Sequence, residues 1–138
     1  MFLLDTNVVS ELRRADKANP RVFAWAAAAP VADFFLSAIS VLELELGVLM
    51  LERRDASQGQ VLRAWLDDQI LPRFEGRILA VDTTVALQCA RLHVPDPRSH
   101  RDATIAATAL VHGMTVATRN VADFAPTGVR TFNPWIEG

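Results

Sequence analysis

Four acidic residues stand at positions where a folded chain could bring them together. They are Asp5, Glu43, Asp102 and Asp123. Two carboxylates about 4 Å apart, at an effective dielectric constant near 20, repel each other by roughly 4 kcal/mol. A group of such side chains therefore either takes up protons or binds a cation. Because oxygen ligands without a His or Cys pattern favour magnesium over zinc, these acids predict a Mg²⁺ site in which Mn²⁺ can substitute.

Five short apolar runs, each typical of a buried parallel strand, would position these acids. The runs cover residues 2–4, 34–36, 78–81, 115–118 and 129–132. Between them lie segments with helical spacing, at residues 8–13, 41–54, 61–71 and 103–111. This alternation predicts a three-layer α/β/α sandwich with a central, mostly parallel sheet of four or five strands. We expect a single domain over residues 1–138, because no linker or internal repeat interrupts the chain.

The topology of such a sheet predicts that the four acids share one edge. Asp5 directly follows the first strand, and ligands of open α/β sheets bind outside the carboxyl ends of the strands. Right-handed crossovers start every helix at that same edge. The other three acids follow strands or open helices there: Glu43 in the first turn after strand 34–36, Asp102 at the start of helix 103–111, and Asp123 after strand 115–118.

Ordinary helix capping explains three of these acids as well. Each stands three residues after a good N-cap residue, in the pairs Ser40 and Glu43, Ser99 and Asp102, and Asn120 and Asp123. This spacing is that of a capping box, and the helix dipole favours an acid there by about 0.3 to 1 kcal/mol. Asp5 is the exception, because Asn7 is the better cap for helix 8–13. A shared metal site and separate caps both remain open.

Glu45 competes with Glu43 for a place in the site. We prefer Glu43, because it shares a helix face with Gly47, which is small enough to let the sheet edge approach closely. Among the scattered arginines, Arg119 adjoins the acids and is the best candidate for a phosphate contact.

Composition limits the class of protein. The 138 residues are 51% apolar, which is enough for one sizeable core, and 14 basic against 16 acidic residues give a net charge of −2. No global excess of positive charge therefore indicates a nucleic-acid partner, and any RNA contact must be local or metal-assisted. The single cysteine, Cys89, has apolar neighbours and predicts a buried thiol in a cytoplasmic protein. Neither a signal peptide nor a membrane-spanning segment is expected.

Four motifs follow one another along the chain. They are Leu3-Leu4-Asp5-Thr6-Asn7, Ser37-Ala38-Ile39-Ser40-Val41-Leu42-Glu43-Leu44, Asp102-Ala103-Thr104-Ile105-Ala106-Ala107-Thr108-Ala109 and Thr118-Arg119-Asn120-Val121-Ala122-Asp123-Phe124. In this order they resemble the PIN-domain toxins of the VapC type. The runs at residues 70–74 and 132–135 resemble the FitB-type branch, so the similarity covers essentially the whole chain.

The resemblance implies a magnesium-dependent endoribonuclease, the toxin of a type II toxin–antitoxin system, that blocks translation by cutting RNA. It also implies an antitoxin of the VapB or FitA type, whose C-terminal segment covers the acidic groove and often places an arginine against the carboxylates. A homodimer is expected, with operator DNA bound only through the antitoxin.

The resemblance also assigns roles to single residues. Asp5 and Asp102 match the direct metal ligands, and Glu43 and Asp123 complete the cluster or act through waters. Asn7, Thr118 and Asn120 match the supporting shell of the site. Some FitB-like chains carry an acid where this chain has Asn120, and we therefore take Asp123 as the fourth acid.

Two other functions stay open. A magnesium-dependent phosphatase or phosphotransferase would use Asp5 as a nucleophile and form an aspartyl-phosphate. The absence of a second acid two residues later, where Asn7 stands, argues against it. A non-catalytic assembly module would use the acids only as helix caps.

Overall fold

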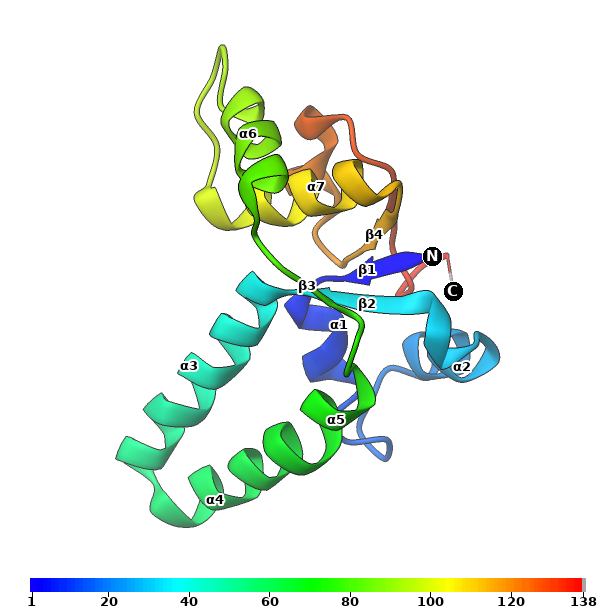
Figure 1. Ribbon diagram of the computed structural model, residues 1–138. Coiled ribbons are helices and arrows are strands. Elements are labelled where there is room, and N and C mark those ends of the chain that lie inside the picture. The colour runs from blue at the N-terminus through cyan, green and yellow to red at the C-terminus, as the bar shows by residue number, and fades with distance from the viewer. Residues whose placement is uncertain (138) are drawn as a thin grey trace.

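The computed structural model describes residues 1–137 and has an all-parallel, five-stranded sheet at its centre (Figure 1). The strands are β1 (Phe2–Leu4), β2 (Phe34–Ser37), β3 (Ile78–Leu79), β4 (Thr115–Ala117) and β5 (Thr131–Phe132), in the order β3-β2-β1-β4-β5. Leu3 pairs with Phe35 on one side and with Val116 on the other. The predicted α/β sandwich is therefore confirmed, with five strands.

Helices connect successive strands. They are α1 (Thr6–Glu11), α2 (Pro20–Ala28), α3 (Ala38–Arg54), α4 (Ala56–Trp65), α5 (Leu71–Arg73), α6 (Thr83–Leu92), α7 (His100–His112) and α8 (Val121–Phe124). A π-helical turn, Leu66–Ile70, joins α4 to α5, and 3-10 turns at Val31–Asp33 and Ala125–Thr127 precede β2 and follow α8. In the described part of the chain, no helix is both long and apolar enough to cross a membrane.

The helices form one layer on each face of the sheet, because neighbouring strand residues point to opposite faces. Leu4 packs in a cluster with residues of α1 to α5 and the π-helical turn. Leu3 packs in a second cluster with residues of α7 and α8. Figure 1 shows α6 and α7 above the sheet and α1 to α5 below it.

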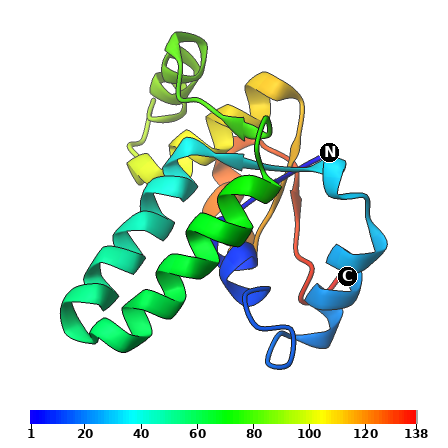
Figure 2. The ribbon, with the colours of Figure 1, turned by 60° about the horizontal axis from the view of Figure 1, so that its bottom comes forward.

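α3 and α4 form an antiparallel pair that extends away from the sheet (Figure 2). Gly59 of α4 lies at a close approach of the two helices, since a Cβ at this position would be 2.5 Å from the Cα of Glu52. A larger residue there would push the helices apart. This pair carries Glu43 at one end, near the sheet, and a separate set of charged residues along its length.

Several predicted boundaries were wrong by up to five residues, and side-chain caps explain the early helix starts. α1 begins at residue 6 rather than 8, α3 at 38 rather than 41, and α4 at 56 rather than 61, because Asp5, Ser37 and Asp55 cap these helices. The strand expected at residues 78–81 ends at Leu79. Cys89 is half-buried rather than buried, with its Sγ 3.7 Å from Thr104 Oγ1.

Candidate active site

The acids gather at the carboxyl edge of the sheet, at its topological switch point. From β1 the chain adds β2 and β3 on one side, and from β3 it crosses to β4 and β5 on the other. In open α/β sheets, ligands bind where the strand order reverses in this way. Asp5 follows β1 and Thr118 follows β4, so their side chains meet at this point.

Asp5 is fully buried, and its carboxylate accepts hydrogen bonds from four groups. Oδ1 accepts from the backbone N–H of Thr6 at 2.7 Å and from the guanidinium of Arg101. Oδ2 accepts from Thr118 Oγ1 at 2.8 Å and from Asn7 Nδ2 at 3.5 Å. Burying a carboxylate costs several kcal/mol, and these donors offset that cost. The side chain is thereby fixed in one orientation.

The expectation that Asn7 caps the first helix was wrong. α1 begins at Thr6, and Asp5 is its N-cap with an extended backbone at φ −66° and ψ 152°. Asp5 therefore does cap a helix, because the chain turns into α1 immediately after β1. Asn7 lies inside α1, where its buried Oδ1 has no hydrogen-bond donor within residues 1–137.

Glu43 contacts the site through Thr6. Because Ser37 caps α3, Glu43 lies in the second turn of that helix and not in the first, as we had expected. Its Oε1 accepts a hydrogen bond from Thr6 Oγ1 at 2.7 Å, and its Oε2 accepts one from Arg101 Nε at 2.6 Å. Thr6, which the sequence did not single out, thus links Glu43 to Asp5.

Glu45, the competing acid, points to α4 instead. Its two carboxylate oxygens accept hydrogen bonds from Arg63, both at 2.7 Å. The structure thus brings Glu43 and not Glu45 to Asp5, but the reason we gave was wrong. A Cβ at Gly47 would meet nothing within 4 Å, so no close approach occurs at that residue.

Asp102 lies in the first turn of α7, as expected. Its backbone N–H donates to the capping hydroxyl of Ser99 at 3.0 Å, while its Oδ1 accepts from Arg101 Nη1 at 2.8 Å. Asp102 therefore belongs to a capped helix start and to the acidic cluster at once. Of the other two predicted pairs, Ser40 and Glu43 do not cap α3, because Ser40 is buried inside that helix. Asn120 is the N-cap residue of α8, but its side chain makes no capping hydrogen bond in the described part of the chain.

Arg101 lies among the three carboxylates, although nothing we drew from the sequence suggested it. Its Nη2 binds Asp5, its Nε binds Glu43 and its Nη1 binds Asp102. Burial lowers the pKa of Arg101, but hydrogen bonds and charges of Glu43 and Asp5 outweigh burial and raise that pKa above its ordinary value. The sequence did contain a signal for Arg101. The helix dipole disfavours a cation in the first turn of a helix, so an arginine there indicates acidic partners nearby.

Asn120, Asp123 and Arg119 follow β4 at the same edge. The backbone N–H of Asn120 donates to Thr118 Oγ1 at 2.9 Å. Asp123 is exposed in the first turn of α8, and no hydrogen bond or ion pair in the described part of the chain joins its side chain to the other acids. The guanidinium of Arg119 lies over the Trp135 ring, 5.4 Å from its centroid.

The donor set suits a hard divalent cation. Three carboxylates and the buried, unpaired Oδ1 of Asn7 are oxygen ligands of the kind that Mg²⁺ takes. Among residues 1–137, however, no three His, Cys, Asp or Glu side chains already surround a common metal position. The carboxylates are instead arranged around the guanidinium of Arg101.

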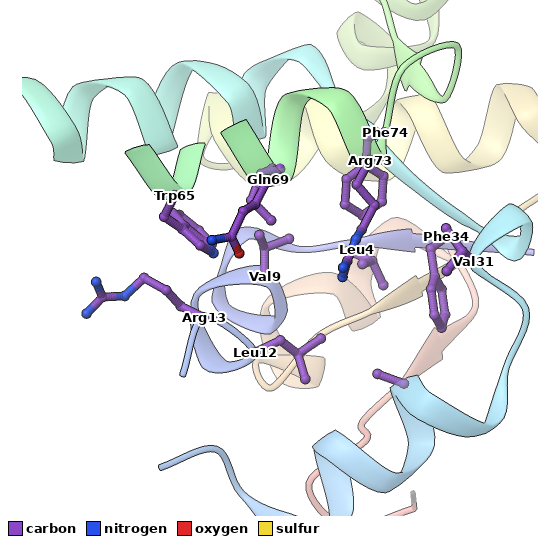
Figure 3. A pocket seen from close by; sticks show the side chains of 12 residues that line it. Leu4, Val9, Leu12, Arg13, Val31, Phe34, Trp65, Gln69, Arg73 and Phe74 are labelled. Carbon is purple, nitrogen blue, oxygen red and sulfur yellow. The ribbon is translucent and has the colours of Figure 1, made fainter. Parts of the chain in front are cut away.

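A separate cavity of about 130 Å³, with both apolar and polar lining residues, lies on the α1 side of the sheet (Figure 3). Its lining includes Leu4, Val9, Trp65 and Phe74, together with the side chain of Arg13. None of the four predicted acids lines it. The cavity is therefore distinct from the acidic site.

Comparison with known proteins identifies the family. The PIN domain model matches residues 2–125. The chain is 43% identical to toxin FitB of Neisseria gonorrhoeae over 141 residues, which cover 98% of this chain and 99% of FitB. It is 36% identical to the VapC ribonuclease Y4jK of Sinorhizobium fredii, over 98% of each chain. The crystal structure of FitAcB from Neisseria gonorrhoeae matches with a TM-score of 0.90 and 42% identity, over 99% of each chain. The chain therefore belongs to the PIN-domain family, in its branch of FitB- and VapC-type toxins.

Proposed function

We propose that this protein is the toxin of a type II toxin–antitoxin system and acts as a magnesium-dependent endoribonuclease. One observation carries the proposal: Asp5, Glu43 and Asp102 meet at the switch point of the sheet, with Asp5 fully buried. Helix capping does not explain why acids from three distant segments converge. The names of the relatives agree with hydrolysis of RNA phosphodiester bonds.

Asp5 and Asp102 are the proposed direct ligands of Mg²⁺, for which Mn²⁺ would substitute. Glu43 and Asp123 complete the acidic site, either directly or through waters. A bound divalent cation in such a site activates a water and neutralises charge that develops on the phosphate. No side chain of the protein needs to act as a nucleophile.

The surrounding polar residues hold the acids in place. Thr118 and Asn7 fix Oδ2 of Asp5, and the backbone N–H of Asn120 fixes the hydroxyl of Thr118 in turn. Such fixed geometry favours catalysis, because little reorganisation is needed when substrate binds. Arg119, exposed at the same edge, is the proposed contact for an RNA phosphate.

The direct test is RNA cleavage by the purified protein with Mg²⁺, with EDTA, and after the substitution Asp5→Asn. We expect EDTA to abolish cleavage and Asp5→Asn to reduce it by about 100-fold or more, as for loss of one fixed charged group in an active site. Asp68→Asn, an exposed acid of the π-helical turn, is the matched control. Unchanged cleavage by a folded Asp5→Asn protein would overturn the proposal.

The geometry does not favour a phosphatase with Asp5 as its nucleophile. Both carboxylate oxygens of Asp5 are hydrogen-bonded, and the side chain is fully buried. A phosphorylated Asp5, detected by mass spectrometry, would decide for that alternative. A non-catalytic assembly module would show no metal-dependent cleavage of any RNA.

The antitoxin is the proposed partner, with operator DNA bound only through it. A basic antitoxin segment would complement the acidic site electrostatically. The test is to sequence RNA ends after expression of the parent and of Asp5→Asn, each with and without the neighbouring gene. We expect new RNA ends only for the parent expressed alone.

A homodimer is the second proposed assembly. Leu42, Leu46, Leu49 and Met50 of α3 are each at least half exposed, and their spacing puts them on one helix face. An exposed apolar face of this kind is typical of a protein–protein contact. Sedimentation of Leu46→Glu should show a monomer, while Leu87→Glu on α6 should sediment as the parent does.

A further inference from the structure

Five of the six carboxylate oxygens of Asp5, Glu43 and Asp102 already accept hydrogen bonds from groups of the protein. Arg101 gives each of the three carboxylates one guanidinium nitrogen. The contacts with Glu43 and Asp102 are 2.6 and 2.8 Å long. Thr6 and Thr118 bind the same carboxylates of Asp5 and Glu43 as well. A cation at Oδ1 of Asp5 would therefore lie close to the guanidinium of Arg101, and the two positive charges would repel each other.

Electrostatics explains why an arginine occupies this position. Three neighbouring carboxylates repel one another strongly, and Asp5 has no access to solvent that would screen its charge. The planar guanidinium carries several donors in a fixed fork, so one side chain can serve all three acids. These contacts outweigh the unfavourable position of Arg101 in the first turn of α7.

We propose that Arg101 is an internal counter-ion that competes with the divalent cation for Asp5, Glu43 and Asp102. The inference rests on the proposed metal-dependent function. The Arg101 side chain is long and 31% exposed, so rotation about its own bonds can carry the guanidinium towards solvent without moving α7. Arg101 is thus a positioning residue, which holds the acids together in the free protein and sets the affinity for the cation.

The test measures Mn²⁺ affinity by isothermal titration calorimetry and by the electron paramagnetic resonance signal of free Mn²⁺. We expect Arg101→Gln to bind Mn²⁺ roughly tenfold more tightly than the parent, because charge-assisted hydrogen bonds need not be broken first. Arg101→Lys should lie between the two, since its ammonium keeps the charge but not the planar fork. If Arg101 had only a structural role, its substitution would not raise the affinity for Mn²⁺.

Arg63→Gln is the matched control, because Arg63 also binds three acids and its loss changes the net charge equally. Its Mn²⁺ affinity should stay within about twofold of the parent, because exposed charges at a distance are screened. If Arg101→Gln is unfolded without metal, its refolding by Mn²⁺ at concentrations that leave the parent unchanged would support competition.

Two results would overturn the inference. The first leaves the proposed metal site intact, and the second overturns the proposed function as well. If the parent binds Mn²⁺ and Arg101→Gln binds it equally or more weakly, competition is wrong while the proposed metal site stands. If neither protein binds Mn²⁺, and Asp5→Asn behaves as they do, the proposed metal-dependent function fails and the inference fails with it.

Discussion

Two clusters in this protein have the same composition, one arginine among three carboxylates, but lie in different environments. At the sheet edge, Arg101 binds Asp5, Glu43 and Asp102; between α3 and α4, Arg63 binds Glu45, Glu52 and Asp67. One helix serves both clusters, because Glu43 and Glu45 stand two positions apart on α3. Burial, and the origin of the acids in the chain, distinguish the candidate active site from the contact between helices.

Burial is the first difference. The side chain of Asp5 is fully buried, whereas Glu45, Glu52 and Asp67 are 40%, 37% and 46% exposed. Exposed ion pairs contribute little, because water solvates the separated charges nearly as well. A buried carboxylate has no such alternative, and it requires fixed partners or a cation. Composition alone therefore does not identify a site.

The origin of the acids is the second difference. The acids at the sheet edge come from the residue after β1, from α3 and from α7, whereas Glu45 and Glu52 both come from α3 and Asp67 from the π-helical turn after α4. Hydrogen bonds with Glu45 and Glu52 raise the pKa of Arg63 above its ordinary value. This second cluster holds α3 against α4, where the close approach at Gly59 already brings the two helices together.

The sharpest test of the comparison substitutes the two neighbouring glutamates of α3. We expect Glu43→Gln to reduce RNA cleavage by about 100-fold, because a charged group of the proposed active site is lost. Glu45→Gln should leave cleavage within about twofold of the parent, since the Glu45 carboxylate is hydrogen-bonded to Arg63 and, within residues 1–137, to none of the site residues. The measurement is the rate of RNA cleavage under single-turnover conditions. Equal losses of cleavage in both variants would contradict the assignment of only one cluster to the active site.

The second test compares the two arginines by unfolding in urea without metal. Arg101→Gln leaves Asp5 as a buried charge without its cation, and we expect a loss of about 3 kcal/mol in the free energy of unfolding. Arg63→Gln should cost less, because its acids are exposed to water. A larger loss of unfolding free energy for Arg63→Gln would show that the exposed cluster stabilises the fold more than the buried one, contrary to this prediction.

The smallest effect concerns pH. The hydrogen bond from Arg63 lowers the pKa of Glu45 from its ordinary value of 4.5, burial acts in the opposite direction, and the charge of Arg63 adds to the lowering. Stability from this pair is therefore present above pH 4.5 and is lost as the pH falls through the lowered pKa. The stability difference between the parent and Glu45→Gln should shrink below pH 4.5. A difference that stayed constant down to pH 2 would contradict this assignment.

The sequence predicted the elements of the fold well because their signals are local. Short apolar runs marked each of the five strands, and the alternation with helical segments indicated a parallel sheet. Helix starts were less accurate, since Asp5 and Ser37 cap helices earlier than the apolar pattern indicates. Capping depends on where the chain leaves a strand, and hydrophobic spacing does not record that point.

By itself, the sequence determined the type of fold, the edge of the sheet where acids gather and the four motifs of the family. Only the tertiary structure showed which acids meet, and it placed Arg101 between Asp5, Glu43 and Asp102 while Glu45 turned to Arg63. The physical reason is that electrostatic partners depend on distances between segments far apart in the chain. Those distances are fixed by the packing of α3 and α7 on the sheet and not by any local pattern of residues.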